Sequence, residues 1–174
     1  MKRQSPTSGF LRTRSNVVMK DPSVEASMLI SRPPGEVFAA FVNPQTLRKF
    51  WLTDASGPLA PGARVQWQFM VPGATAKVFV TKFEAPRVLS FDWPDDGLHV
   101  DMTFDAFGDG GTRAGIAVSG FDGAEILSDV VGTVEGFSIV LSDLKTLLET
   151  GESAGLVRDK AALIVAGQAT RGGG

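Results

Sequence analysis

The stretch DGAEILSDVVGTVEGFSIVLSDLKTLLETG, residues 122–151, keeps a helical period for longer than any other segment of the chain. Asp122 and Glu125 form a capping-box pattern at its start, and Gly151 stands where a left-handed residue would end a helix. The sequence therefore predicts one helix of about 42 Å, at 1.5 Å per residue. Its apolar residues recur three or four positions apart as one stripe: Leu127, Val130 or Val131, Val134, Phe137, Leu141, Leu144 and Leu148.

A stripe of this length needs an apolar surface of similar length, and no second long helix precedes it. From residue 59 the apolar period changes from helical to alternating, and Pro-Gly, Ala-Pro and Pro-Asp-Asp-Gly turns interrupt it. Short turns between alternating segments are typical of an antiparallel meander. The expected strands are 23–31, whose Val24, Ala26, Met28 and Ile30 share one face, and then about 64–69, 77–83, 89–93, 98–107 and 112–119.

Two short helices are expected between the first strand and the meander. Glu36–Val42 begins just after two prolines, and Gln45–Trp51 follows the break at Asn43-Pro44. The pair has no basic recognition face, which argues against DNA reading. The order of elements predicts an α+β domain in which a curved antiparallel sheet of about six strands surrounds the long C-terminal helix.

Composition excludes several classes of protein. The chain has 174 residues, 43% of them hydrophobic, and no apolar run long enough to span a membrane, as expected for a soluble single domain with tails. It has no cysteine and one histidine, so disulfides, zinc sites and Cys-His chemistry are not expected. We expect no cofactor, no metal and a cytoplasmic location.

Basic residues gather at the N-terminus. The first 20 residues hold five basic and no acidic side chains, which leaves 12 basic and 19 acidic side chains in the rest. The body of the chain is thus acidic and is not expected to bind nucleic acid. Residues 1–22 resemble a transit peptide or a nucleic-acid arm, but their low apolar content favours a disordered tail.

Several short motifs, in the right order, carry a family resemblance. They are ISRPPGEVF (30–38) with Asn43-Pro44 and Phe50-Trp51, LAPGARV (59–65), APRVLSFDW (85–93), Gly111-Thr112-Arg113, Ser119-Gly120-Phe121, and Gly136-Phe137 followed by the leucines of the long helix. Residues 24–150 resemble START-like (SRPBCC) proteins, in the branch of the activator of heat-shock-protein 90 ATPase (AHSA). The resemblance implies a helix-grip (Bet v 1-like) fold over residues 23–151.

The resemblance leaves the function open, because the superfamily includes lipid carriers, polyketide cyclase-like enzymes, hydrolases and co-chaperones. In this chain Val118 and Phe137 stand where many relatives carry a histidine and a tryptophan. Both changes remove a hydrogen-bonding group from the inner face, which lowers the expectation of proton-transfer catalysis.

Large apolar side chains are predicted to project into the space between the long helix and the sheet. They can pack as a filled core or line a cavity, and Gly132 and Gly136 on the helix leave room for either arrangement. The candidate cavity residues are Trp51, Trp67, Phe69, Phe91, Trp93, Phe104, Val118, Val134, Phe137 and Leu141.

The polar candidates for a site have structural explanations. His99 and Asp101 share a strand face and could form an acid-base pair, but alternation points that face outward. Asp95-Asp96 could bind a cation, yet Pro-Asp-Asp-Gly is typical of a turn. The remaining candidates, as guards of a cavity mouth or as surface cations, are Arg32, Arg64 and Arg113.

The C-terminal extension, residues 152–174, lies outside the resemblance. Leu156, Val157, Ala161 and Leu163–Val165 have a loosely helical spacing. A short helix here could pack back on the domain or against a second subunit in a homodimer.

The sequence favours a non-catalytic domain that binds a small hydrophobic or aromatic molecule between the helix and the sheet. The alternatives are a cyclase- or hydrolase-type enzyme, which needs a polar side chain facing inward, and a co-chaperone-like interaction domain, for which a chaperone partner is the less expected outcome.

Overall fold

One seven-stranded antiparallel sheet forms the frame of the computed structural model, which describes residues 22–172. Its spatial order is β1-β7-β6-β5-β4-β3-β2, so the strands from β2 onward follow the chain and β1 joins at the far edge. The strands are β1 (Val24–Ile30), β2 (Leu52–Ala55), β3 (Arg64–Phe69), β4 (Thr75–Glu84), β5 (Val88–Trp93), β6 (Leu98–Phe107) and β7 (Gly111–Ser119).

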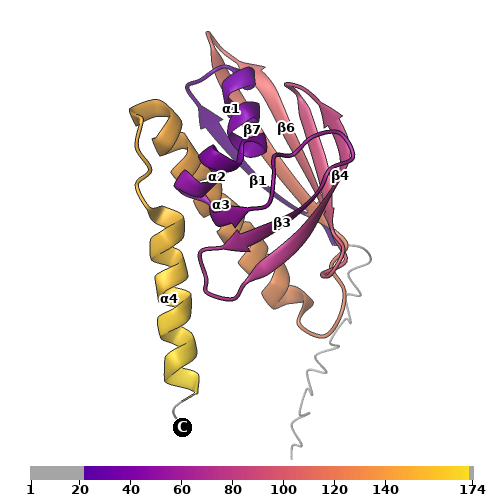
Figure 1. Ribbon diagram of the computed structural model, residues 1–174, viewed down its shortest axis with the longest axis vertical. Coiled ribbons are helices and arrows are strands. Elements are labelled where there is room, and N and C mark those ends of the chain that lie inside the picture. The colour runs from indigo at the N-terminus through magenta and orange to yellow at the C-terminus, as the bar shows by residue number, and fades with distance from the viewer. Residues whose placement is uncertain (1–21, 173–174) are drawn as a thin grey trace, which may run out of the picture.

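Helices cover one face of this sheet. The short helices α1 (Pro34–Val42) and α2 (Pro44–Phe50) connect β1 to β2. The long helix α3 (Ile126–Thr150) crosses the curved sheet, and α4 (Leu156–Arg171) runs back alongside α3 on its outer side (Figure 1). This arrangement confirms the predicted α+β helix-grip fold.

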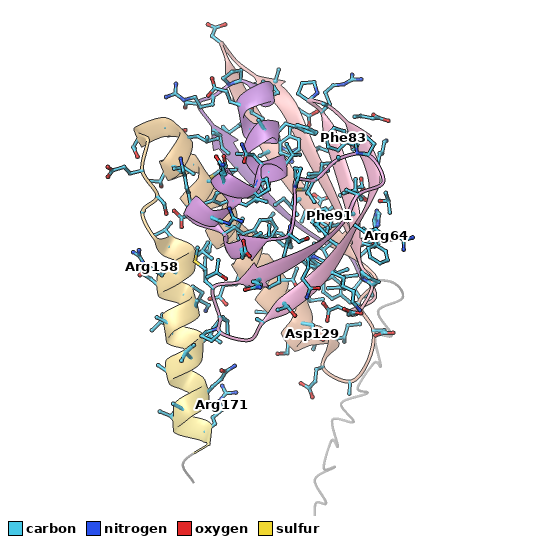
Figure 2. All side chains as sticks on the ribbon, viewed as in Figure 1. Arg64, Phe83, Phe91, Asp129, Arg158 and Arg171 are labelled. Carbon is cyan, nitrogen blue, oxygen red and sulfur yellow. The ribbon has the colours of Figure 1, made fainter. Side chains whose placement is uncertain are left out.

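The alternating strands place their apolar side chains toward α3. In β3, for example, Val65 and Trp67 are buried while Arg64 and Gln66 are exposed. Figure 2 shows side chains filling the space between sheet and helices, with Phe91 in the middle and Arg64 on the outside. The buried face of α3 consists of Phe137, Val140, Leu141, Asp143, Leu144 and Leu147.

Strand β2 was not predicted. It has four residues with the burial order buried, exposed, half-buried, buried, and its pairing with β3 shifts register between Leu52 and Asp54. A strand this short, with an irregularity inside it, shows no alternation from which a sequence pattern could be recognised.

The start of α3 was also predicted wrongly, whereas its end is confirmed. The helix begins at Ile126, and the preceding Glu125 makes no side-chain capping bond. Gly123 has a φ of 90°, so the chain turns between Asp122 and Glu125 rather than entering the helix there. At the other end Gly151 adopts the predicted left-handed conformation and donates its N–H to the Leu147 carbonyl at 2.9 Å.

Polar contacts fasten the C-terminal end of α3 to the end of β1. The Ser31 N–H donates to Glu149 Oε1 at 2.7 Å, and Lys145 Nζ donates to the Leu29 carbonyl at 2.8 Å. The hydrogen bond from Lys145, and then that from Ser31, lower the pKa of the Glu149 carboxyl. Arg32 donates to the Leu148 carbonyl at 2.8 Å, so it ties the helix to the strand rather than guarding a cavity.

The extension after α3 packs back on its own domain as α4, one of the two arrangements left open by the sequence. The predicted tail, residues 1–22, lies outside the described residues except for its last residue. Within residues 22–172, no helix combines the length and the apolar character needed to cross a membrane.

Candidate functional site

An apolar groove of about 310 Å³ lies between α3, α4 and the hairpin that joins β3 to β4. Trp51, Phe69 and Trp93 close it on the sheet side. The hairpin contributes Met70, Val71 and Ala74, helix α3 contributes Thr133, Gly136, Phe137, Ile139 and Val140, and α4 contributes Val157, Lys160, Ala161 and Ile164.

Four of the ten candidate cavity residues line this groove: Trp51, Phe69, Trp93 and Phe137. Val134 is half-buried on α3 and is not among the lining residues. The other five have at most 1% of their surface exposed and belong to the core: Trp67, Phe91, Phe104, Val118 and Leu141.

Aromatic rings fill the space directly between α3 and the sheet. The ring centroids of Trp51 and Trp67 are 4.9 Å apart, and those of Trp67 and Phe91 are 5.4 Å apart, both in edge-to-face geometry. Trp93 and Phe137 stack with centroids 5.9 Å apart and planes 9° from parallel. These separations are those of well-packed aromatic pairs, so the groove lies beside the filled core rather than within it.

Two indole N–H groups in this cluster are buried without a hydrogen-bond acceptor among the described residues. They are Nε1 of Trp67 and Nε1 of Trp93. An unpaired buried donor costs about 1–3 kcal/mol. Of these two residues, Trp93 lines the groove, whereas Trp67 lies in the core.

Gly136 opens the α3 side of the groove. A Cβ built on this glycine meets no atom within 4 Å, and the same holds for Gly132 one turn earlier. Glycine inside a helix costs about 1 kcal/mol relative to alanine, and here no close neighbour explains that cost. Gly136 lines the groove while Gly132 does not, so only Gly136 adds to the space in it.

Helix α4 is held in place by a buried carboxylate from α3. Asp143 is fully buried; its Oδ1 accepts from Ser153 Oγ at 2.6 Å and from the Ala154 N–H at 3.1 Å, and its Oδ2 accepts from the Val157 N–H at 3.2 Å. The residue before α4, Gly155, offers no side chain to cap it. Asp143 thus acts as the cap, with its negative charge at the positive end of the α4 dipole.

One ion pair crosses from α4 to α3 at the groove. Lys160 Nζ donates to Glu135 Oε1 at 2.6 Å, and Glu135 immediately precedes Gly136. Lys160 is the single ionisable residue among those that line the groove. The other cation in this part of α4, Arg158, is 73% exposed and points away from α3 (Figure 2).

The polar candidates lie on the opposite face of the sheet, away from the groove. His99 is bracketed by two carboxylates, with Nδ1 2.5 Å from Asp92 Oδ1 and Nε2 3.3 Å from Asp101 Oδ1. The hydrogen bond to Asp92, with the nearby charge of Asp101, raises the pKa of His99. Ser90 Oγ donates to Asp101 and not to His99, so this cluster does not form a serine nucleophile with its base.

The remaining charged candidates also lie outside the groove. Asp95 and Asp96 occupy the predicted turn, where Asp95 pairs with Lys77 at 3.2 Å. Arg64 covers the ring of Phe79, and Arg113 borders a small depression on the outer face of the sheet. Among residues 22–172 no group of three or more His, Cys, Asp or Glu side chains is arranged so that it could hold a metal ion.

The sequence did not point to the α4 wall or to the β3–β4 turn. Met70, Val71 and Ala74 surround a Pro-Gly pair that indicated only a turn, and Ile139 and Val140 lie beside the predicted stripe of α3. The spacing of Val157, Ala161 and Ile164 at four and three residues was visible as a helical face, although its partner was not.

The fold and the groove define the class of protein: a helix-grip domain with an added C-terminal helix. Residues 31–149 match the sequence model of the family described as Activator of Hsp90 ATPase homolog 1-like protein. Since this match covers more than half of the chain, the protein belongs to that family. The match ends before α4, so four of the residues that line the groove come from outside the family domain.

Solved structures share the fold. Protein SSP2350 from Staphylococcus saprophyticus has a TM-score of 0.67 and 23% identity, over 76% of this chain and 95% of that chain. DynU16, from the dynemicin biosynthetic locus, has a TM-score of 0.67 and 21% identity, over 77% of this chain and 49% of that chain. The Aha1 dimer from Colwellia psychrerythraea has a TM-score of 0.63 and 17% identity, over 76% and 99% of the two chains.

At these identities the structural neighbours bear on the fold alone. A comparison with curated protein sequences gives no significant match. The function is therefore inferred from the chemistry of the groove itself.

Proposed function

We propose that this protein binds a small apolar or aromatic molecule in the groove between α3, α4 and the β3–β4 hairpin, and that it does so without catalysing a reaction. The ring faces of Trp51, Trp93 and Phe137 and the aliphatic side chains of α4 supply a surface for such a molecule. Aromatic and aliphatic walls with few polar groups are typical of small-molecule sites.

The open space at Gly136 is the observation that carries this proposal. A helix that packs for stability alone would gain about 1 kcal/mol from alanine at this position, and the structure has room for it. The glycine instead leaves the groove deeper by one side chain. A volume of about 310 Å³ is at the lower end of the range for ligand pockets, which fits a molecule of two or three rings.

The enzyme alternative has less support. Of the lining residues, Lys160 is the one that ionises, and it is already paired with Glu135. Acid-base catalysis needs a titratable group within hydrogen-bond reach of the reacting atoms, and His99 lies on the other face of the sheet. No contact among the described residues favours a co-chaperone role over a ligand.

The experiment is a fluorescence titration with the neutral apolar probe N-phenyl-1-naphthylamine. Gly136→Leu fills the groove, while Gly132→Leu adds the same side chain to the same helix one turn away, where a Cβ also meets nothing within 4 Å. We expect saturable one-to-one binding by the wild type and by Gly132→Leu, and binding at least about tenfold weaker in Gly136→Leu.

Circular dichroism of both variants serves as the check on folding. Since leucine is a better helix former than glycine, neither variant should lose helical signal. Absence of saturable binding by the wild type, or equal affinity of the two variants, would show that the groove is not a ligand site.

A further inference from the structure

We infer that the ligand of this groove carries an anionic group, such as a carboxylate or sulfonate, which binds the ammonium group of Lys160 while its aromatic body lies against Trp93 and Phe137. This inference rests on the proposed function and specifies the chemical class of the ligand.

Lys160 has N–H donors that a ligand in the groove could use. Its side chain belongs to the groove wall, and its Nζ reaches across to Glu135 on α3. An ammonium group has three N–H donors, and of the described residues only Glu135 accepts from it. Two donors therefore remain for a ligand oxygen at the rim.

The ion pair between Lys160 and Glu135 is weak. The Glu135 side chain is 52% exposed and that of Lys160 is 31% exposed, so water screens their attraction. A ligand anion can share Lys160 with Glu135, or replace it, at small cost. The exposed carboxylate of Glu135 then returns to solvent, whereas Lys160 keeps a partner.

The polarity of the groove wall is uneven. One cation stands at the edge of a groove whose other residues are apolar or, in Thr133, carry a hydroxyl. A wall of this kind matches a molecule with an apolar body and one charged end, because the body is buried while the charge stays at the solvated rim.

A purely structural role for the ion pair makes a different prediction. If Lys160 and Glu135 only fasten α4 to α3, loss of the charge should weaken binding of neutral and anionic molecules alike. If Lys160 recognises the ligand, loss of the charge should affect only the anionic molecule.

The test uses two probes with the same ring system: neutral N-phenyl-1-naphthylamine and its sulfonate, 8-anilino-1-naphthalenesulfonate. Lys160→Met keeps an apolar stem of similar length, and Glu135→Gln removes the competing anion. Lys77→Met is the matched control, because Lys77, on β4, forms an exposed ion pair with Asp95 and does not line the groove.

We expect Lys160→Met to weaken binding of the sulfonate about fivefold to tenfold and to change that of the neutral probe less than about twofold. Glu135→Gln should strengthen sulfonate binding, and Lys77→Met should leave both affinities unchanged.

Two results would overturn the inference while the proposed function stands: equal weakening of both probes by Lys160→Met, or no effect on either probe when Gly136→Leu abolishes both. Failure of the wild type to bind the neutral probe saturably would instead refute the proposed function itself.

Discussion

Asp143 is the residue that joins the family domain to its C-terminal helix. It lies on α3, within the matched region, and all three groups that donate to it lie beyond residue 149. A carboxylate buried this completely is retained in a fold only when its oxygens are hydrogen-bonded. A residue of α3 therefore fixes the position at which α4 begins.

Substitution of Asp143 by alanine tests whether this carboxylate holds α4 in place. We expect Asp143→Ala to lower the free energy of unfolding by about 2 kcal/mol, because two backbone donors and one hydroxyl at the start of α4 lose their acceptor. Hydrogen exchange of the α4 amides should accelerate. Ser142→Ala is the control, since Ser142 bonds only within α3. Unchanged protection of α4 in Asp143→Ala would contradict this account.

His99 contributes to the stability of the folded protein through its two carboxylate neighbours, Asp92 and Asp101. Its pKa is raised above the ordinary 6.5, chiefly by the hydrogen bond to Asp92. A raised pKa means that the folded protein holds the proton more tightly than the unfolded chain. The resulting stabilisation is complete below pH 6.5 and is lost as the pH rises through the pKa of the folded state.

The stability of the protein between pH 6 and 9 should therefore depend on His99. The free energy of unfolding of the wild type should decrease over this range, and that of His99→Gln should decrease less. The chain has one histidine, and its α-amino group is shared by both proteins, so the difference isolates His99. Parallel pH profiles, measured by urea unfolding, would refute the assignment.

Helix α4 forms one wall of the groove but adds little to the core of the domain. The core lies between α3 and the sheet, whereas α4 adds a single buried residue, Ala161. Deletion of residues 152–174 should leave cooperative unfolding in place and lower the helical circular dichroism signal only by the contribution of α4. Binding of N-phenyl-1-naphthylamine should fall by at least about tenfold, because one wall of the groove is removed. Wild-type affinity in the truncated protein would place the site elsewhere.

Elements with a clear period could be predicted from the sequence, and those without one could not. The stripe of α3, its end at Gly151 and the six alternating strands were recognised because burial on one face imposes a period. Strand β2 has four residues and an irregular register, and the turn before α3 includes the pattern Asp122 to Glu125, which resembles a cap but does not form one. Strand β2 therefore gives no periodic signal, whereas before α3 the positive φ of Gly123 turns the chain where the local pattern indicates a cap.

At the scale of the whole molecule, the candidate site could be predicted only in part. The aromatic residues of the inner face were identified, but sequence alone could not show whether such large rings leave a gap or fill it. They fill it at Trp67, Phe91 and Phe104, and the groove forms one layer further out at Trp51, Phe69, Trp93 and Phe137. Its position depends on where α4 docks, which Asp143 determines across ten or more residues of chain.

A crystal structure of the protein with N-phenyl-1-naphthylamine bound would show whether the groove is the ligand site. We predict electron density for the probe beside Gly136, in contact with Trp93 and Phe137 on one side and with Ile164 of α4 on the other. Density on another surface, or side chains of α4 closed onto Gly136 with no probe between them, would contradict it.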